Sequence, residues 1–450
     1  MVIIDKLFFH STVNIVEMAN YTRDQIENLD ISGVEDLSFA FKGHNTTSSY
    51  NLTKWNVSNA RNMSHMFEGS SSTGFNISDW NCYNVTNTSY MFDKCTSITF
   101  IYLTNFNTTR VENMSSMFNG CSQLKILDLS TIDVSNVKDM SSMFNGCSQL
   151  TELHITKWNV SKVENMSSMF SCCSQLKILN LSSWNVENVE DMSNMFSGCS
   201  QLTTIRMDNW SSNKNVNMSN MFNGCSTLVN ISMKYWHFTG KVNLSNMFND
   251  CRNIKDLDLS MCYMNAVENM TTCFQNCAQI QKLDLSNFRL IDNCSTNGLL
   301  TSCTGLRELN LSNWKILPVS VLMNLFQNLN NLHVIYFPET YKTLGIHNQF
   351  LRVRFNIPTT TQIEWTAYDE EINDEDEDES IDDEDEDMKS MYSKTPMSAD
   401  VCTVEDYKKQ NIKDLREIES LQQRIDKLKS IVENRTLLIQ ILERQEELNE

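Results

Sequence analysis

The sequence predicts a repeat solenoid of the leucine-rich-repeat kind, in which a parallel β ladder with short helical turns is wound from twelve coils of about 26 residues. Three observations support this fold class. A Met-Phe dipeptide recurs at a fixed spacing, Leu-x-Leu, Trp and Cys positions recur with it, and 41% of the 450 residues are hydrophobic, enough for a folded core. A C-terminal coiled-coil helix is predicted beyond the solenoid.

The Met-Phe pairs, or near substitutes, set the period. Ten of the eleven steps between them are 26 residues, and one, from Met66 to Met91, is 25. Chance does not produce such spacing, and the copies fill residues 29–337. The pairs begin at Ala40, Met66, Met91, Met117, Met143, Met169, Met195, Met221, Met247, Cys273, Leu299 and Leu325.

Each unit is predicted to contain a strand, a second short strand or turn, and a short helix. Leu127 and Leu129 alternate around Asp128, which is typical of a strand. Apolar residues then follow at i, i+3, i+7 and i+10, the spacing of one helical face, and Asn165 stands where a helix cap is expected. In one coil the helical positions are Val163, Met166, Phe170 and Cys173.

Stacking must supply the core, because one 26-residue unit cannot bury its own apolar face. With strands about 4.8 Å apart, like residues of successive coils form columns. We interpret the tryptophan and methionine columns as core and not as ligand stacks, with Met filling gaps around Phe. The Trp-like column is Trp55, Trp80, Phe106, Ile132, Trp158, Trp184, Trp210, Trp236, Cys262, Phe288 and Trp314.

The unit Trp-Asn-Val-Ser-x-Val-x-x-Met-x-x-Met-Phe-x-x-Cys-x-x-Leu-x-x-Leu-x-Leu-Ser resembles the repeat of the BspA-like leucine-rich-repeat surface proteins, especially the variant of Mycoplasma lipoproteins. The resemblance covers about 310 residues. It implies a solenoid, and it implies adhesion to host proteins or cells, although the chain lacks the lipoprotein Cys of the surface members. Relatives of this kind occur in bacteria, protists and giant viruses, and the low Gly and abundant Asn favour a protist or a large DNA virus.

The column of cysteines is interpreted as small buried hydrophobic residues. Neighbouring thiols would lie within disulfide range, so redox and metal roles stay open. A single column, however, supplies a line of ligands and not the tetrahedron that zinc requires. The column is Cys95, Cys121, Cys147, Cys173, Cys199, Cys225, Cys251, Cys277 and Cys303, with Cys172 and Cys273 beside it.

No catalytic constellation is found. The sequence has no glycine-rich phosphate loop, no His-Glu-x-x-His and no Gly-x-Ser-x-Gly, and its seven His are scattered. We therefore predict a protein that is not an enzyme and that needs no metal and no cofactor.

Binding by repeats usually uses the exposed strand surface, where residues vary while the core columns stay fixed. The outward positions of the predicted strands vary in this way, which fits both a partner-binding face and an ordinary solvated face. The candidate partner-binding residues are Tyr102, Ile126, Asp128, His154, Ile178, Arg206, Asp258, Asp284 and Tyr336.

The ends of the chain differ in composition from the repeats. Residues 1–28 and 338–368 are predicted to cap the solenoid, and residues 369–400 to form a disordered acidic linker. Between residues 369 and 387, 15 of 19 residues are Asp or Glu, so this run supplies most of the net charge of −20. Two interpretations of residues 369–387 stay open: a solubilising spacer, and a binding segment for basic partners.

Residues 403–450 lack Gly and Pro and are predicted to form a coiled-coil helix that makes a dimer or trimer. A hetero-coiled coil and a helix docked on the solenoid are the alternatives. The predicted oligomerisation positions are Ile418, Leu421, Ile425, Leu428, Val432, Ile439 and Leu442, with Arg435 as an intruder at one core position.

We read no signal peptide and no transmembrane segment in the sequence, and we expect an intracellular protein, with association with a surface or virion kept open. Many Asn-x-Ser/Thr triplets recur with the repeat, so repetition explains them without glycans.

The function predicted from the sequence is a protein–protein interaction scaffold, adhesin-like or host-interacting, whose solenoids are clustered by the C-terminal helix. Because of its negative charge, no direct nucleic-acid binding is expected. The alternative is an acidic chaperone-like or nucleic-acid-mimicking protein acting through residues 369–387.

Overall fold

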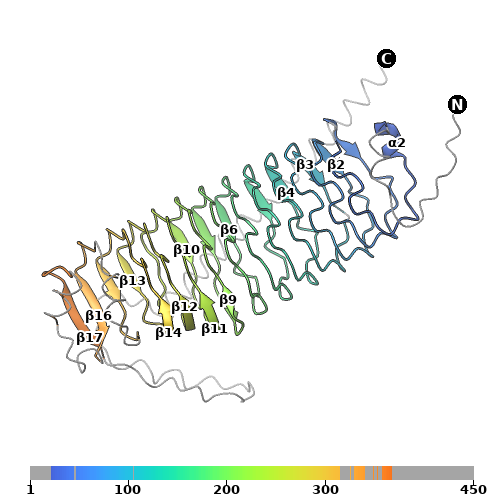
Figure 1. The fold of residues 1–450 in the computed structure, drawn as a ribbon. Coiled ribbons are helices and arrows are strands. Elements are labelled where there is room, and N and C mark those ends of the chain that lie inside the picture. The colour runs from blue at the N-terminus through green and yellow to red at the C-terminus, as the bar shows by residue number, and fades with distance from the viewer. Residues whose placement is uncertain are drawn as a thin grey trace, which may run out of the picture. The chain divides into compact units, whose positions relative to one another are not determined.

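The structure, a computed structural model, describes residues 22–44, 47–104, 106–314, 325, 329–339, 348, 352 and 357–366. These residues form the predicted parallel solenoid (Figure 1). Eleven of the twelve predicted Met-Phe pairs lie wholly within them, and both side chains of every such pair are buried. The predicted acidic linker and coiled coil lie outside the described residues.

The first strands of successive coils make one row of parallel strands, in which Leu127 faces Leu153 and Leu179 faces Ile205. In the coil between β10 and β13, a single bridge joins Asp256 to Lys282. The strands of this first row are β1 (Tyr50–Asn51), β2 (Gly74–Asn76), β3 (Phe100–Tyr102), β4 (Ile126–Asp128), β5 (Glu152–His154), β6 (Ile178–Asn180), β7 (Thr204–Arg206), β10 (Asn230–Ser232), β13 (Lys282–Asp284), β15 (Glu308–Asn310), β16 (Val334–Pro338) and β17 (Gln362–Thr366).

Among the described residues, a second row of parallel strands runs from Ser211 to Ser295 and lies along the other edge of the ribbon in Figure 1, and the earlier coils have isolated parallel bridges from Asp36 to Asn217. The second row consists of β8 (Ser211–Ser212), β9 (Val216–Asn217), β11 (His237–Asn243), β12 (Tyr263–Asn269) and β14 (Phe288–Ser295). Near the N-terminus, the short helix α2 (Arg23–Glu27) begins at Thr22, whose hydroxyl accepts from the Gln25 amide in a capping box.

The second row begins where the sequence loses an Asn or Asp. In six earlier coils, an Asn or Asp follows the Trp-like position, and its side-chain oxygen accepts from the amide two residues on, as at Asn159 with Ser161 (3.2 Å). This bond closes a corner. Ser211, His237 and Tyr263 take that position in the next coils, and without the corner the chain extends into strands.

A second corner of the same kind lies six residues further along each coil, and the two corners together account for many of the Asn-x-Ser/Thr triplets. The Asn113 Oδ1 accepts from the Ser115 amide at 2.8 Å, and the Asp139 Oδ1 accepts from the Ser141 amide at 2.9 Å. Asp therefore does the same work as Asn at this corner. The triplets recur because the turn needs a side-chain acceptor there, followed two residues later by a small polar residue.

The prediction of a short helix at the Met-Phe segment of each coil is wrong. In the described coils from Leu37 to Cys303, the Met-Phe segment is a series of turns that bond to the next coil. The Met140 and Phe144 amides donate to Asn165 and Met169 carbonyls of the next coil, each at 2.9 Å. Ser142 (φ 55°) and Gly146 (φ 71°) are left-handed, so a right-handed helix cannot continue through them. Asn165 closes a turn with the Ser167 amide and does not cap a helix.

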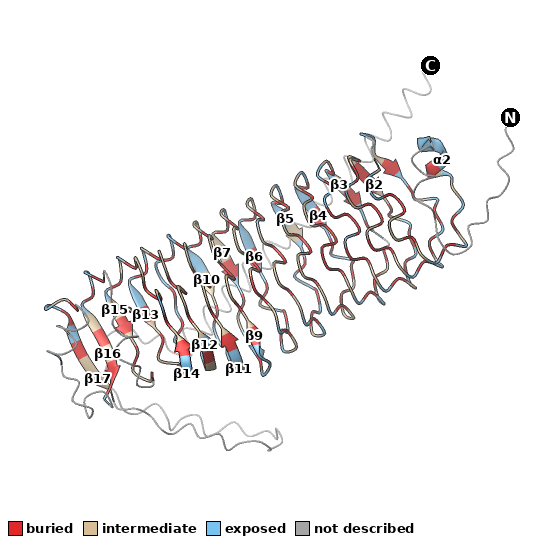
Figure 2. Cartoon of the chain, in the orientation of Figure 1, coloured by how far each residue is buried: buried red, intermediate tan, exposed pale blue. Residues whose placement is uncertain are grey.

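The aromatic columns form the core, as predicted. Figure 2 shows buried residues, in red, in coil after coil. The rings of Phe144 and Phe170 stack with centroids 5.5 Å apart, and those of Trp158 and Trp184 stack at 6.3 Å. The Trp158 indole N–H donates to the Leu129 carbonyl of the preceding coil at 3.2 Å. Five further tryptophans make the same bond: Trp55, Trp80, Trp210, Trp236 and Trp314.

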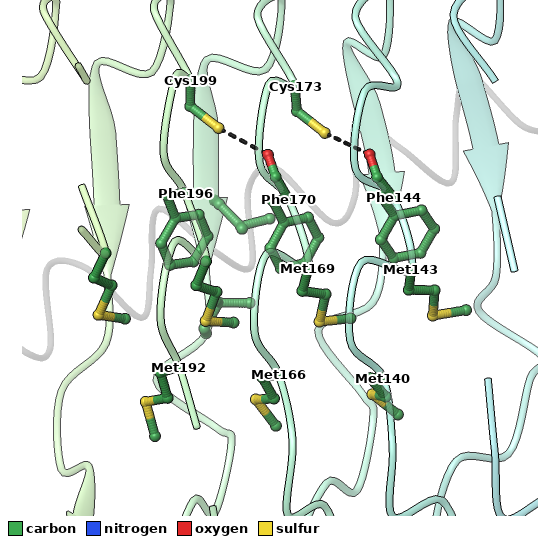
Figure 3. Close-up of a cluster of buried hydrophobic side chains, with 14 of the residues drawn as sticks. Met140, Met143, Phe144, Met166, Met169, Phe170, Cys173, Met192, Phe196 and Cys199 are labelled. Atoms are coloured by element: carbon green, nitrogen blue, oxygen red, sulfur yellow. Dashed lines mark hydrogen bonds between the residues drawn. The ribbon is translucent and has the colours of Figure 1, made fainter. Parts of the chain in front are cut away.

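The cysteine column is buried and also donates hydrogen bonds (Figure 3). The Cys173 and Cys199 thiols donate to the Phe144 and Phe170 carbonyls of the preceding coil, both at 3.1 Å. All described cysteines are free, and burial raises the pKa of Cys147 and Cys199 to about 12. The thiols therefore stay protonated at neutral pH, which disfavours thiolate chemistry in this column.

We expect one fast-reacting thiol in a Cys402→Ser chain titrated with a thiol-specific disulfide reagent at pH 8. Of the 14 described cysteines, only Cys172 is exposed, and the other 13 should react after unfolding in guanidinium. Adding Cys172→Ser should remove the fast phase. Rapid reaction of several thiols in the folded protein would contradict this burial.

Candidate interaction surface

The candidate surface is the strand face, by which we mean the outward side chains of the first strand row. Alternation along each short strand creates it. In β4, Ile126 and Asp128 are exposed, whereas Leu127 between them is buried in the core. The same alternation recurs in β6, so each coil contributes outward side chains at two fixed heights.

Eight of the nine predicted partner-binding residues lie in strands of the first row, and Asp258 lies two residues after the bridge residue Asp256 in the coil between β10 and β13. Asp284 and Tyr336 are only half-buried. The other seven are exposed: Tyr102, Ile126, Asp128, His154, Ile178, Arg206 and Asp258. The strand register brings Asp128 opposite His154, whereas Tyr102 and Tyr336 lie at opposite ends of the row.

Large apolar side chains are exposed on the N-terminal half of the strand face. Tyr102 is 55% exposed, Ile126 56% and Ile178 68%. Ile126 pairs with Glu152, and Ile178 occupies the same column one coil beyond Glu152. The fold does not require isoleucine at an outward position, since Glu152 fills it equally well.

Charged groups surround these apolar residues. Hydrogen bonds from the Ser130 hydroxyl and amide, with a smaller contribution from nearby His154, lower the pKa of the Asp128 carboxyl. The His154 Nδ1 lies 3.7 Å from the Asp128 Oδ1. This carboxylate is therefore ionised at neutral pH and is held beside the exposed Ile126.

The C-terminal half of the strand face carries a shallow hollow of about 310 Å³. Asp258 and Asp284 line it, together with Lys282 and Glu308, whose Nζ and Oε2 atoms lie 2.9 Å apart. The hollow thus presents four carboxylates, including Asp256, partly balanced by Lys255 and Lys282, and it differs in character from the apolar N-terminal half.

The sequence analysis missed a second group of exposed residues, two tyrosines and a methionine, in the coils of β11 and β12. Tyr235, Met261 and Tyr263 are exposed there, and His237 and Tyr263 meet edge to face with ring centroids 6.2 Å apart. The signal was available in the sequence, because the equivalent positions in earlier coils carry polar residues such as Asn159, not aromatic rings.

Within the described ranges, no group of three or more His, Cys, Asp or Glu side chains is arranged to hold a metal ion. No helix among the described residues combines the length and apolar character needed to cross a bilayer.

Comparison with known proteins gives one family. The family described as "Mycoplasma protein of unknown function, DUF285" matches residues 10–127, 91–204, 114–236 and 242–336. The overlapping matches follow from the internal repetition, and they support the repeat family that the sequence resembles. The narrower assignment to the BspA-like surface proteins stays a prediction. No curated protein matches the chain.

Among solved structures, the chain is similar to one described as "Crystal structure of TLR13-ssRNA13 complex", with 13% sequence identity and a TM-score of 0.28. The match covers 74% of this chain and 52% of that one, so the chain spans about half the length of the solved protein. Identity and score are too low to transfer any property of that protein.

Replacing Ile178 by Ser should change the free energy of unfolding by no more than about 0.5 kcal/mol, because the side chain is solvent-exposed. Replacing its buried neighbour Leu179 by Ala should cost about 2 to 5 kcal/mol. Urea denaturation followed by tryptophan fluorescence measures both. Equal losses for the two variants would contradict the assignment of Ile178 to the outer face.

Proposed function

The chain belongs to the family described as "Mycoplasma protein of unknown function, DUF285", and from this premise we propose that it is a non-enzymatic protein–protein interaction scaffold that binds through the strand face. The observation that carries the proposal is the exposure of Ile126 and Ile178 in one column of that face. Clustered apolar side chains on a surface mark protein contacts more often than isolated ones do.

The expected partner is a protein that covers Tyr102, Ile126 and Ile178 with apolar groups of its own. Around this centre, Asp128, Glu152 and other charged residues would form a polar rim. Such a contact gains most of its free energy at the apolar centre, while the charges select the partner. Adhesion to a host protein is the specific form that we propose, on the resemblance of the repeat to BspA-like surface proteins.

We further propose that residues 403–450 cluster several copies of the solenoid. Several strand faces joined through one helical bundle bind a multivalent partner more tightly than one face, without any new contact. The heptad pattern of Ile418, Leu421, Ile425 and Leu428 supports this part of the proposal.

Affinity capture with the immobilised full-length chain tests the surface. A partner identified by mass spectrometry, then purified, should bind the wild-type chain and bind Ile178→Asp at least tenfold more weakly, because a charge would be buried in the apolar centre. Asn265→Asp, which places the same charge on the second strand row, is the matched control and should bind normally.

Deletion of residues 369–387 separates this proposal from its alternative. The deleted chain should still capture the partner, because the strand face is intact. If capture vanished with the deletion and survived Ile178→Asp, the acidic run would be the active part and the chaperone-like alternative would replace the scaffold.

Multi-angle light scattering tests the oligomer. The full-length chain should have two or three times the monomer mass of 52.0 kDa. The double variant Leu421→Asp/Leu428→Asp should return to the monomer mass, because it places charge in the predicted helical seam. A control double variant at the outward heptad positions, Gln423→Asp/Lys427→Asp, should keep the oligomer. A monomeric mass for the wild-type chain would remove the clustering step.

A further inference from the structure

The repeat pattern is interrupted at one place on the surface, at the start of the second strand row. From Asn56 to Asn185, the residue after the Trp-like position is Asn or Asp in every coil, but in the next coils it is Ser211, His237 and Tyr263. Both the backbone and the side chains change there, since β8, β11 and β12 replace corners. Such a local departure from a repeat is where a function of its own is expected.

A pocket of about 410 Å³ lies at this transition. Three successive coils line it, with Glu187 and Asn188 from the first, Ser211 and Asn213 from the second, and His237 and Thr239 from the third. Its volume falls within the range of small-molecule sites, roughly 300 to 1,000 Å³. It lies on the second strand row, apart from the strand face.

The lining is ordered by hydrogen bonds of its own. The buried Ser212 hydroxyl donates to the Glu187 carbonyl at 2.8 Å and accepts from the Lys214 amide at 3.1 Å. The Asn188 Nδ2 donates to the Ser161 carbonyl at 2.8 Å, which fixes the direction of that amide. The Ser212–Glu187 and Asn188–Ser161 bonds join adjacent coils, and together with the Ser212–Lys214 bond they hold the pocket in one shape before any ligand arrives.

Other polar groups of the lining are exposed to solvent and have no hydrogen-bond partner in the described protein. Within the described part of the chain, no protein group hydrogen-bonds the Glu187 carboxylate, the Asn213 amide or the Thr239 hydroxyl. The carboxylate is a strong hydrogen-bond acceptor, the side-chain amide both donates and accepts, and the hydroxyl can do either. A ligand with several neighbouring hydroxyl groups would satisfy all of them.

Aromatic rings lie beside this polar lining. The His237 ring is part of the pocket lining, and the Tyr263 ring, which lies outside the lining, meets it at an interplanar angle of 89°. An exposed ring offers a flat apolar face on which C–H groups pack, next to groups that hydrogen-bond hydroxyls. Sugars combine these two kinds of surface.

Other ligand classes fit the lining less well. No Lys or Arg lines the pocket, so it lacks the cations that bind phosphate. Its side chains are mainly polar, so it lacks the apolar lining that a lipid or a steroid needs. Glu187 is the one Asp or Glu among the lining residues, and a carboxylate there disfavours acidic sugars. We propose that this pocket binds a neutral sugar unit of a glycan.

Saturation-transfer-difference NMR on the full-length chain tests the proposal, with the methyl glycosides of glucose, galactose, mannose and N-acetylglucosamine as probes. At least one should receive saturation from the protein, most strongly at the ring protons that face His237 and Tyr263. Glu187→Ala and His237→Ala should each lower that signal at least fivefold, whereas Glu187→Gln should restore part of it, because the amide still hydrogen-bonds hydroxyls.

Two controls separate this site from the strand face. Glu152→Ala removes an exposed carboxylate from the strand face and should leave the sugar signal unchanged, as should Ile178→Asp. The thermal midpoint of Glu187→Ala should equal that of the wild type, since the side chain is exposed. Sugar binding and partner capture can therefore fail independently.

The proposal is overturned if none of the four glycosides receives saturation, or if the signal persists in both Glu187→Ala and His237→Ala. It is also overturned if inorganic phosphate or methyl N-acetylneuraminate binds more tightly than every neutral glycoside, because the site would then select anions.

Discussion

The whole solenoid depends on peptide groups in the turn segment that point along the stacking direction. The Phe118, Phe144 and Phe170 amides each donate to the Met carbonyl 25 residues further on, at 2.8 to 2.9 Å. Since the same peptide group donates in every coil, neighbouring coils have one register. That register brings like side chains together, so Phe lies on Phe and Cys on Cys, and a composition rich in Met, Phe and Trp becomes a set of columns.

This arrangement leaves some carbonyls facing the core, and the columns supply their donors. The Phe144 carbonyl accepts from Cys173 Sγ, and the Leu129 carbonyl accepts from Trp158 Nε1, each one coil later. A buried carbonyl without a hydrogen-bond donor costs free energy. The cysteine thiol supplies that donor, whereas an alanine at the same position would leave the carbonyl unbonded. Cys262 replaces a tryptophan in the Trp-like column and still supplies a donor, because its thiol donates to the Met233 carbonyl at 2.9 Å.

The period, the first strand row and the buried columns could be predicted, because they depend on spacing within the sequence. The helices could not, since an i, i+3, i+7 pattern arises from successive tight turns as well as from a helix. What distinguishes the two is the left-handed backbone at Ser142 and Gly146 and the amides that bond to another coil, and neither is visible in one unit. The positions of the strand-face residues could also be predicted from the spacing, because they alternate with the buried strand residues. The identity of a binding partner could not, because it depends on the surface of another molecule.

The second strand row was not predicted because its only signal in the sequence is the absence of an Asn or Asp after the Trp-like position. An Asn or Asp side chain closes the corner in six coils. Ser211, His237 and Tyr263 replace it in the next three coils, and there the backbone extends into paired strands because adjacent coils change together. A single coil that lost its corner would have extended backbone with no strand beside it, whereas β11 and β12 pair with each other from His237 to Asn243, with two register shifts. The change therefore had to involve neighbouring coils at once, and the pocket at its boundary is a consequence of that shared backbone path. A surface built by several coils in concert is a stronger candidate for a separate function than one that differs by side chains alone.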